Sequence, residues 1–366
     1  MDEATTESRR PPKWVYTVAF TMAILALMMM NEAFWLSIGI LLFSTGLLIL
    51  SADMFVGAVK IVARRFGMSE LIIGLTIVSI GTSMPEILVG VSSSLEVAAN
   101  GCTPEACASD FALGNIYGSV LVQISLVLGI VVLIHPLEVR PDWLARDGLL
   151  MFLAVVVLTM LILIDAKLDR MEGLILCLVY LMYLVNLIHQ RDNIREDELI
   201  LKSPGSEPEV IETNDFALLA SVVVGLSLAI WSATVLVNSA TTIAGAMSIP
   251  PSFIGATITA IGTSLPELAV ALTAARHSKG VAIGTLIGSN ITDPLLSIGL
   301  TALVHPVTIG SSDIFFYLII PATIITTGLS LLFMYTDFKF QRWEGGVLVA
   351  CYAIFVGLLI AASNII

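Results

Sequence analysis

The stretch GLTIVSIGTSMPEI, residues 74–87, places a proline and a glutamate side by side within an apolar segment. The chain repeats this motif as GATITAIGTSLPEL at residues 255–268, and the two align without gaps at nine identical positions of fourteen. A second pair follows, because residues 114–136 match residues 284–306 at 8 of 23 positions. The sequence therefore contains an internal duplication, and each copy carries a helix breaker beside an acid.

The composition is that of a membrane protein. Of the 366 residues, 57% are hydrophobic and 13% are charged, whereas soluble domains carry roughly a quarter charged residues. A bilayer core of about 30 Å needs about 20 mostly apolar residues per helix. The chain offers eleven such spans, which excludes a soluble globular class: 14–30, 34–62, 70–98, 109–133, 147–164, 171–189, 215–243, 251–276, 280–303, 313–334 and 342–362.

The Lys and Arg residues predict how these spans are oriented. With eleven spans, fifteen of the seventeen cationic residues fall in one set of loops, and only Lys167 and Arg170 fall in the other. Basic residues favour the cytoplasmic side, so we expect a multi-pass protein of the cell membrane with a cytoplasmic N-terminus and an extracellular C-terminus. The helix carrying Glu86 then runs outward and the helix carrying Glu267 runs inward. The two copies are inverted, an arrangement found in many secondary transporters.

The predicted fold class is an all-α polytopic membrane protein, with ten core transmembrane helices in two inverted repeats and one extra N-terminal helix. Residues 1–33 would form the cytoplasmic N-terminus and the extra helix, and residues 34–189 the first half. Residues 190–214 would form a cytoplasmic linker, and residues 215–366 the second half. Residues 14–30 leave one alternative open, because a basic stretch before an apolar run also fits a cleaved signal peptide.

Each proline predicts a break in its helix beside a group of oxygen atoms. Pro85 and Pro266 have no N–H for the carbonyl four residues earlier, and a freed carbonyl is unfavourable in lipid unless a polar group meets it. A carboxylate, a threonine hydroxyl and the freed carbonyl lie within one turn at each break. Oxygens of these kinds are the ligands that Ca²⁺ takes in proteins.

The second arm of the duplication adds a third acid. Asp293 lies within an apolar span, and its counterpart in the first copy is the neutral Gln123. Intramembrane acids are functional by default, although a protonated carboxyl hydrogen-bonded between helices is the structural alternative. Three such charges match three Na⁺, or one Ca²⁺ with one carboxyl protonated or unpaired.

These motifs resemble a known family. GTSMPE and GTSLPE, each followed by a GS element on the next helix, are similar to the alpha-repeats of the sodium/calcium exchanger branch of the cation/calcium exchanger superfamily. The resemblance implies that Glu86 and Glu267 bind Ca²⁺. Gln123 departs from it, because the family usually has Asn there. The implied site comprises Glu86, Glu267, Thr82, Thr263, Asp293, Ser83, Ser264, Ser119, Ser289, Gln123, Ser79 and Ala260.

The predicted function is secondary active antiport of Ca²⁺ against Na⁺, with Ca²⁺/H⁺ antiport as the alternative. The expected partners are Ca²⁺ and Na⁺, or H⁺ in the alternative, together with the lipid bilayer. We expect no cofactor and no nucleic acid, and a monomer. An intramembrane metalloenzyme is the competing class, but its metal site would normally include His, and no His lies near the centre of either repeat. We therefore expect a transporter and not an enzyme.

Cys102 and Cys107 lie in a loop that we expect on the extracellular side, where we also expect them to form a disulfide.

Overall fold

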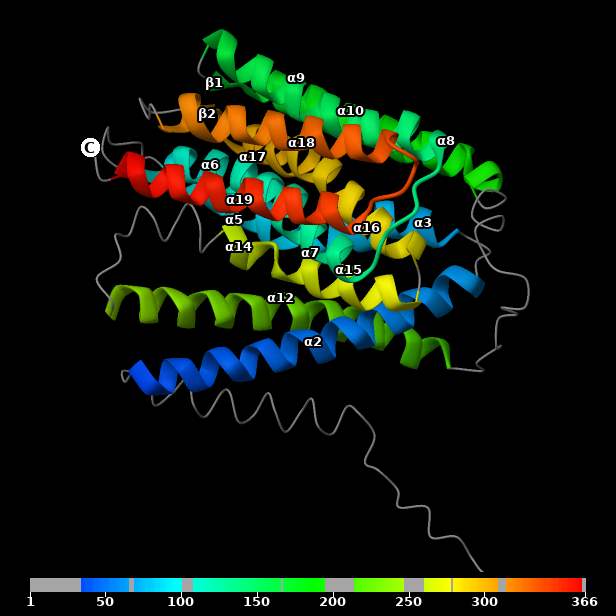
Figure 1. Ribbon diagram of the computed structural model, residues 1–366. Helices are drawn as coiled ribbons and strands as arrows, with labels where there is room; N and C mark the ends of the chain where they lie inside the picture. Colours follow the sequence, from blue (N-terminus) through cyan, green and yellow to red (C-terminus); the bar gives the residue numbers. More distant parts are fainter. Residues whose placement is uncertain are drawn as a thin grey trace, which may run out of the picture.

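The computed structural model describes residues 34–65, 69–100, 108–165, 167–194, 214–246, 260–277, 279–308 and 314–363. Within these ranges the protein is helical apart from two strands of two residues each. Figure 1 shows the long helices lying roughly parallel to one another, as spans of a single membrane would.

The first half runs from residue 34 to residue 189. Its elements are α2 (Phe34–Arg65), α3 (Glu70–Ile73), the π-helical η1 (Gly74–Val78), α4 (Ser79–Thr82), α5 (Met84–Asn100), α6 (Ala108–Leu121), the π-helical η2 (Val122–Val127), α7 (Leu128–Ile134), α8 (Pro141–Trp143), the π-helical η3 (Leu144–Gly148), α9 (Leu149–Asp165), β1 (Lys167–Leu168) and α10 (Arg170–His189).

The second half repeats the order of the long helices. Its elements are α12 (Asp215–Ala246), α14 (Ala260–Thr263), α15 (Leu265–His277), α16 (Lys279–Thr292), the π-helical η5 (Asp293–Ser297), α17 (Ile298–Val304), β2 (Val307–Thr308), the π-helical η6 (Phe315–Ile319), α18 (Ile320–Tyr335) and α19 (Arg342–Ser363).

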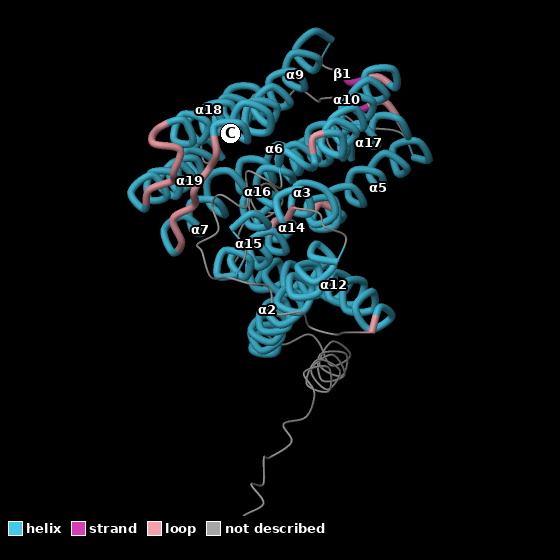
Figure 2. Tube along the Cα trace, turned by 90° about the vertical axis from the view of Figure 1, so that its right-hand side faces the viewer, coloured by secondary structure: helices cyan, strands magenta, loops and turns pink. Residues whose placement is uncertain are grey.

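The duplication in the sequence is also a duplication in structure. Helices α2 and α12 are both 32 residues long, and each lies directly before the broken helix of its own half. They pack side by side and run in opposite directions, at one side of the bundle in Figure 2. This antiparallel pairing of equivalent helices is what inverted repeats produce.

The membrane-protein class predicted from composition is confirmed. Among the described residues, eight helices are long and apolar enough to cross a membrane, and nine if the bent pair Leu71–Thr82 and Met84–Val91 counts as one span. The expected span 14–30 lies outside the described residues, and the expected span 251–276 is described only from Ala260 onward. The total of eleven spans therefore stays a prediction.

Burial separates central spans from peripheral ones. Lys279–Val304 is 94% buried and Ala112–Ile134 is 83% buried, whereas Arg170–His189 is only 28% buried. The peripheral α10 exposes apolar side chains such as Met182, which would face lipid. The central spans are the second arms of the two repeats, so the duplicated motifs lie in the interior.

Glycines let the two halves approach closely at the centre. A Cβ on Gly74 would lie 2.8 Å from the Cα of Gly284, and a Cβ on Gly288 would lie 2.8 Å from the Cβ of Ser79. Small residues at such crossings are how membrane helices gain close packing. Because η1 and α4 belong to the first half and α16 to the second, these contacts join the halves at the level of the duplicated motif.

Two short backbone pairings also join the halves, at opposite ends of the molecule (Figure 1). Lys167 of β1 pairs with Thr308 of β2, and Glu138 forms an isolated antiparallel bridge with Lys339. Each pairing links one residue of the first half with one of the second. In the repeat, position 138 corresponds to position 308, and position 167 corresponds to position 339. The two pairings are therefore equivalent to each other.

Candidate functional site

Both duplicated helices are broken at the serine two residues before the proline. The first bends by 42° between Leu71–Thr82 and Met84–Val91, with Ser83 at the break. Ser264 separates α14 from α15 in the second. Glu86 and Glu267 thus fall in the first turn of α5 and α15. A helix N-terminus favours a negative charge, so the break itself helps to stabilise each carboxylate.

The two glutamates are fully buried and short of hydrogen-bond donors. Oε1 of Glu86 accepts a hydrogen bond from Ser119 Oγ at 2.8 Å. Oε2 of Glu86 and both carboxylate oxygens of Glu267 have no hydrogen-bond partner of standard geometry among the described residues. Buried polar groups are normally paired, so three unpaired carboxylate oxygens at equivalent positions mark the place where a cation would fit.

Ser119 connects the two halves at this point. Its hydroxyl, which donates to Glu86, also lies 3.1 Å from Thr263 Oγ1 and 3.1 Å from Ser264 Oγ. Ser119 comes from α6 of the first half, whereas Thr263 and Ser264 form the break in the second. Three predicted site residues, Glu86, Thr263 and Ser264, therefore contact the hydroxyl of a fourth, Ser119.

Gln123 and Asp293, which occupy equivalent positions in the repeat, form a second contact between the halves. Gln123 Nε2 donates to Asp293 Oδ2 at 3.0 Å, and Ser297 Oγ donates to Oδ1 at 3.3 Å. Gln123 Oε1 has no partner among the described residues. Both side chains extend from π-helical segments, η2 and η5, and such irregular turns occur often at functional sites.

The three acids interact electrostatically without forming one compact cluster. Glu267 lies close enough to Glu86 and Asp293 for their charges to repel it. Even so, no three acidic, His or Cys side chains of the described residues are close enough together to hold a metal ion by themselves. A bound cation would therefore need neutral oxygens from hydroxyls, amides or carbonyls beside one or two carboxylates.

The threonines of the motif take equivalent positions. Thr82 Oγ1 donates to the carbonyl of Ser79 at 3.3 Å, and Thr263 Oγ1 donates to the carbonyl of Ala260 at 3.3 Å. Each hydroxyl thus lies beside the backbone carbonyl of a residue that belongs to the implied site. This match places Ser79 and Ala260 at related points of the two halves.

The predicted serines differ in what their hydroxyls contact. Ser83 Oγ is buried near Asp293 and makes no hydrogen bond of standard geometry with the described residues. Ser289 Oγ donates to the carbonyl of Thr285 at 2.7 Å, within its own helix. Ser83 can therefore turn its hydroxyl toward a ligand, while Ser289 has already used its hydrogen and offers the lone pairs of its oxygen.

Sequence reasoning did not single out Ser297, Thr292 or Tyr180. Ser297 binds Asp293 from one helical turn away, a spacing that could have identified it. Thr292 precedes Asp293 and lies within hydrogen-bonding distance of Tyr180, at 3.0 Å between hydroxyl oxygens. Tyr180 is on the distant helix α10, so no local motif points to it.

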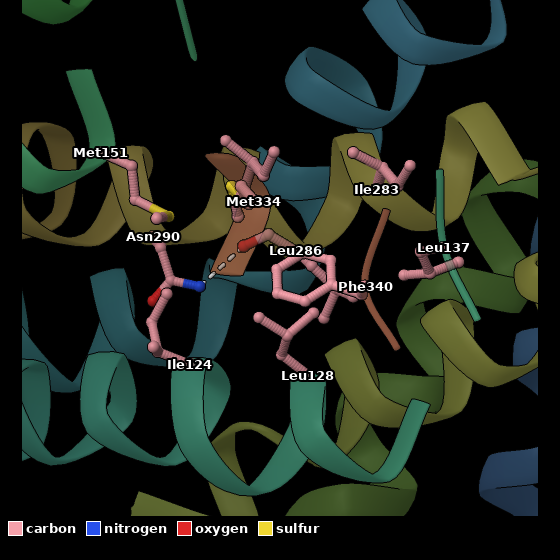
Figure 3. Close-up of a pocket in the computed structure, with 10 residues that line it drawn as sticks. Ile124, Leu128, Leu137, Met151, Ile283, Leu286, Asn290, Met334 and Phe340 are labelled. Atoms are coloured by element: carbon pink, nitrogen blue, oxygen red, sulfur yellow. Dashed lines mark hydrogen bonds between the residues drawn. The ribbon is translucent and has the colours of Figure 1, made fainter. Parts of the chain in front are cut away.

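Asn290 lines a small apolar pocket, shown in Figure 3, whose walls include Met151, Met334 and Phe340. Its amide donates to the carbonyl of Leu286 at 2.6 Å. The pocket lacks acidic residues and is not the candidate site.

Fold and site define a polytopic membrane protein with buried acids at the junction of two inverted halves. The family model described as "Sodium/calcium exchanger protein" matches residues 36–189 and 217–361. The chain therefore belongs to the sodium/calcium exchanger family. Members of this family are transporters and not enzymes, which removes the metalloenzyme alternative.

Relatives and solved structures agree with this assignment. The chain is 29% identical over 352 residues to the sodium/calcium exchanger MaX1 of Methanosarcina acetivorans, a match that covers 87% of this chain and 97% of that protein. It is 36% identical over 267 residues to the inner membrane protein YrbG of Escherichia coli, covering 71% and 77%. A solved structure of the sodium-calcium exchanger NCX_Mj soaked with Na⁺ and Ca²⁺ superposes with a TM-score of 0.70 at 28% identity, covering 88% of this chain and 98% of that chain.

Proposed function

We propose that this protein is a secondary antiporter that exchanges Ca²⁺ for Na⁺ across the membrane by alternating access. The observation that carries the proposal is the set of three fully buried carboxylate oxygens of Glu86 and Glu267 for which the described residues supply no hydrogen-bond partner of standard geometry. An unpaired carboxylate inside a membrane is strongly unfavourable. A cation that binds there and leaves again would relieve this during each transport cycle.

Ca²⁺ suits the pair of glutamates. Ca²⁺ takes six to eight oxygen ligands and favours charged ones. Glu86 and Glu267 would supply the charge, and the hydroxyls and carbonyls beside them would supply neutral ligands. Thr82 and Thr263, each four residues before a glutamate and hydrogen-bonded to a backbone carbonyl, are two of these neutral groups.

Na⁺ would bind the same acids together with one edge of the site, which is the group of oxygens near Asp293. We assign further neutral oxygen ligands to this edge and to its equivalent in the other half. These oxygens come from Ser79, Ala260, Ser83, Ser264, Ser119, Ser289 and Gln123. A single positive charge needs less compensation from carboxylates than Ca²⁺ does. With three acids available, we expect exchange of more than two Na⁺ for each Ca²⁺, so that transport moves net charge.

The arrangement of the halves supports alternating access. The site lies where Ser119 of one half contacts Thr263 and Ser264 of the other. In inverted repeats, movement of one half against the other opens such a site to one side and closes it to the other. We further propose that the N-terminus is cytoplasmic, the C-terminus is extracellular, residues 190–214 form a cytoplasmic linker, and the protein works as a monomer without a cofactor.

Ca²⁺/H⁺ antiport is the second candidate, and one contact favours it. Both oxygens of Asp293 already accept hydrogen bonds, from Gln123 and Ser297. An acid satisfied in this way has less need of Na⁺. The carboxyls of Glu86 and Glu267 would then exchange Ca²⁺ for protons.

Purified protein in proteoliposomes separates the two candidates. With the membrane potential clamped by K⁺ and valinomycin, Ca²⁺ uptake is measured under an outward Na⁺ gradient at equal pH, and under an outward proton gradient without Na⁺. We expect uptake under the Na⁺ gradient, with a rate that changes with the clamped potential. Uptake that follows the proton gradient and ignores Na⁺ would replace the proposal by the second candidate.

A further inference from the structure

Tyr180 of α10 contacts Thr292, the residue directly before Asp293 of the candidate site. Its side chain is 2% exposed, and its hydroxyl oxygen lies 3.0 Å from Thr292 Oγ1. Thr292 uses its only hydroxyl hydrogen for the carbonyl of Gly288, at 2.8 Å. Tyr180 is therefore the donor, because a hydroxyl has a single hydrogen to give.

Thr292 lies between two groups of the candidate site. It immediately precedes Asp293 at the junction of α16 and η5. Its Oγ1 also lies 3.4 Å from the Oγ of Ser79, on α4. The Tyr180 hydroxyl interacts electrostatically with both Ser79 and Asp293. A hydrogen bond from Tyr180 thus fixes Thr292, which lies beside Ser79 of the first half and directly precedes Asp293 of the second half.

The other half has the tyrosine without its partner. Helix α10 begins with RMEG at Arg170 and α19 begins with RWEG at Arg342, so Tyr180 is equivalent to Tyr352. Tyr352 is 6% exposed, and its hydroxyl has no hydrogen-bond partner among the described residues. In the alignment of the repeats Thr292 matches Val122 and Ser79 matches Ala260, and neither valine nor alanine has a hydroxyl.

The repeat therefore retains the tyrosine in both halves, and within the described part of the chain only Tyr180 has a hydrogen-bond partner for its hydroxyl. This difference makes the two equivalent edges of the site unequal. The edge at Ser79 and Asp293 is held by a hydrogen bond to a neighbouring helix. The equivalent edge at Ala260 and Gln123 has no such support from Tyr352.

We propose that Tyr180 is a positioning residue for the Ser79–Asp293 edge, and that through Thr292 it sets the affinity of this edge for Na⁺. The inference rests on the proposed Na⁺-coupled exchange. Neutral oxygens and one acid at this edge suit a monovalent cation, whereas Ca²⁺ would depend on Glu86 and Glu267. Tyr180 therefore affects Na⁺ more than Ca²⁺.

The test compares Tyr180→Phe with two controls that the chain itself provides. Tyr352→Phe removes the equivalent hydroxyl where it has no partner among the described residues. Tyr183→Phe removes a hydroxyl on the same helix that donates to Asp147 at 3.1 Å and not to a residue of the candidate site. The Na⁺ and Ca²⁺ concentrations for half-maximal exchange, the maximal rate and the thermal unfolding midpoint are measured for each variant.

We expect Tyr180→Phe to raise the half-maximal Na⁺ concentration by roughly threefold to tenfold, which is what loss of one buried neutral hydrogen bond amounts to. The half-maximal Ca²⁺ concentration should change by less than twofold. Tyr352→Phe should change neither. Tyr183→Phe should lower the unfolding midpoint and leave the Na⁺ dependence unchanged.

Thr292→Val gives an independent measurement, because it keeps the side-chain volume and removes the acceptor. It should reproduce the Na⁺ effect, and the double variant should be no worse than the more affected single variant. A Na⁺ dependence in Tyr180→Phe equal to that in Tyr352→Phe would overturn the inference, as would failure of both Tyr180→Phe and Thr292→Val to fold. Wild-type uptake that ignores Na⁺ would instead overturn the proposed function.

Discussion

Replacing Gly288 by Ala should separate the two halves at the site. A Cβ at this position would lie 2.8 Å from the Cβ of Ser79 and 2.9 Å from the Cα of Leu75. Neither atom is the end of a flexible side chain, so the backbones of α16 and α4 must move apart. The displacement needed is about 0.6 to 1.2 Å, the difference between 2.8 Å and the 3.4 to 4 Å of ordinary contact.

The expected loss of stability is about 1–3 kcal/mol, the usual effect of an extra methyl group in a packed core. Alanine also favours a helix over glycine by about 1 kcal/mol, so the clash is measured against a control. Gly357→Ala on α19 supplies it, because a Cβ there meets nothing within 4 Å among the described residues. Both variants gain the higher helix propensity of alanine, so the difference between their unfolding midpoints reports the clash.

The assay combines thermal unfolding in detergent with Ca²⁺ uptake into proteoliposomes. Gly288→Ala should unfold at a lower temperature than Gly357→Ala and should transport more slowly, since Ser79 is displaced from α16. Equal midpoints and equal uptake in the two variants would refute the close crossing of the halves on which the site geometry depends.

Two further outcomes follow from the side chains of the site and from the sequence. Gln123→Asn should shift the preference among cations while keeping transport, because the shorter amide no longer reaches Asp293, whose Oδ2 lies 3.0 Å from Gln123 Nε2. The shift is measured by competition of other ions with Ca²⁺ uptake. A competition profile unchanged for every ion would remove Gln123 from the site. Cys102 and Cys107, which lie outside the described residues, should form a disulfide, and two free thiols in a mass spectrum of the unreduced, alkylated protein would exclude it.

The sequence predicted the parts of the site that the duplication carries. Alignment of the two motifs placed Glu86 and Glu267 at equivalent breaks, and the structure has those breaks at Ser83 and Ser264. Proline has a known local effect on a helix, so these features follow from short-range chemistry. The antiparallel pairing of α2 with α12 likewise agrees with the inversion inferred from Lys and Arg.

Contacts between the halves were beyond sequence reasoning. Ser119 lies 144 residues from Thr263 in the sequence, and its contact depends on how α6 packs against the second half. The bond between Tyr180 and Thr292 spans 112 residues and involves a helix without any motif. Periodicity indicates which face of a helix is buried, and it does not indicate which hydroxyl will meet which partner.

The two glutamates provide the most direct test of the proposed site. Glu86→Gln and Glu267→Gln each keep the side-chain volume and remove one negative charge from a fully buried position. The fold should tolerate both changes, because a neutral amide is easier to bury in a membrane than an ionised carboxylate. Glu138→Gln, at a partly exposed acid in the loop that pairs with Lys339, is the matched control.

The decisive measurement is Na⁺-driven Ca²⁺ uptake by the three purified variants, each first shown to be monodisperse with an unfolding midpoint near that of the wild type. Both site variants should lose uptake to a similar extent, because the glutamates occupy equivalent positions around one site, and Glu138→Gln should transport normally. Wild-type uptake by folded Glu86→Gln or Glu267→Gln would contradict the assignment of that glutamate to the Ca²⁺ site.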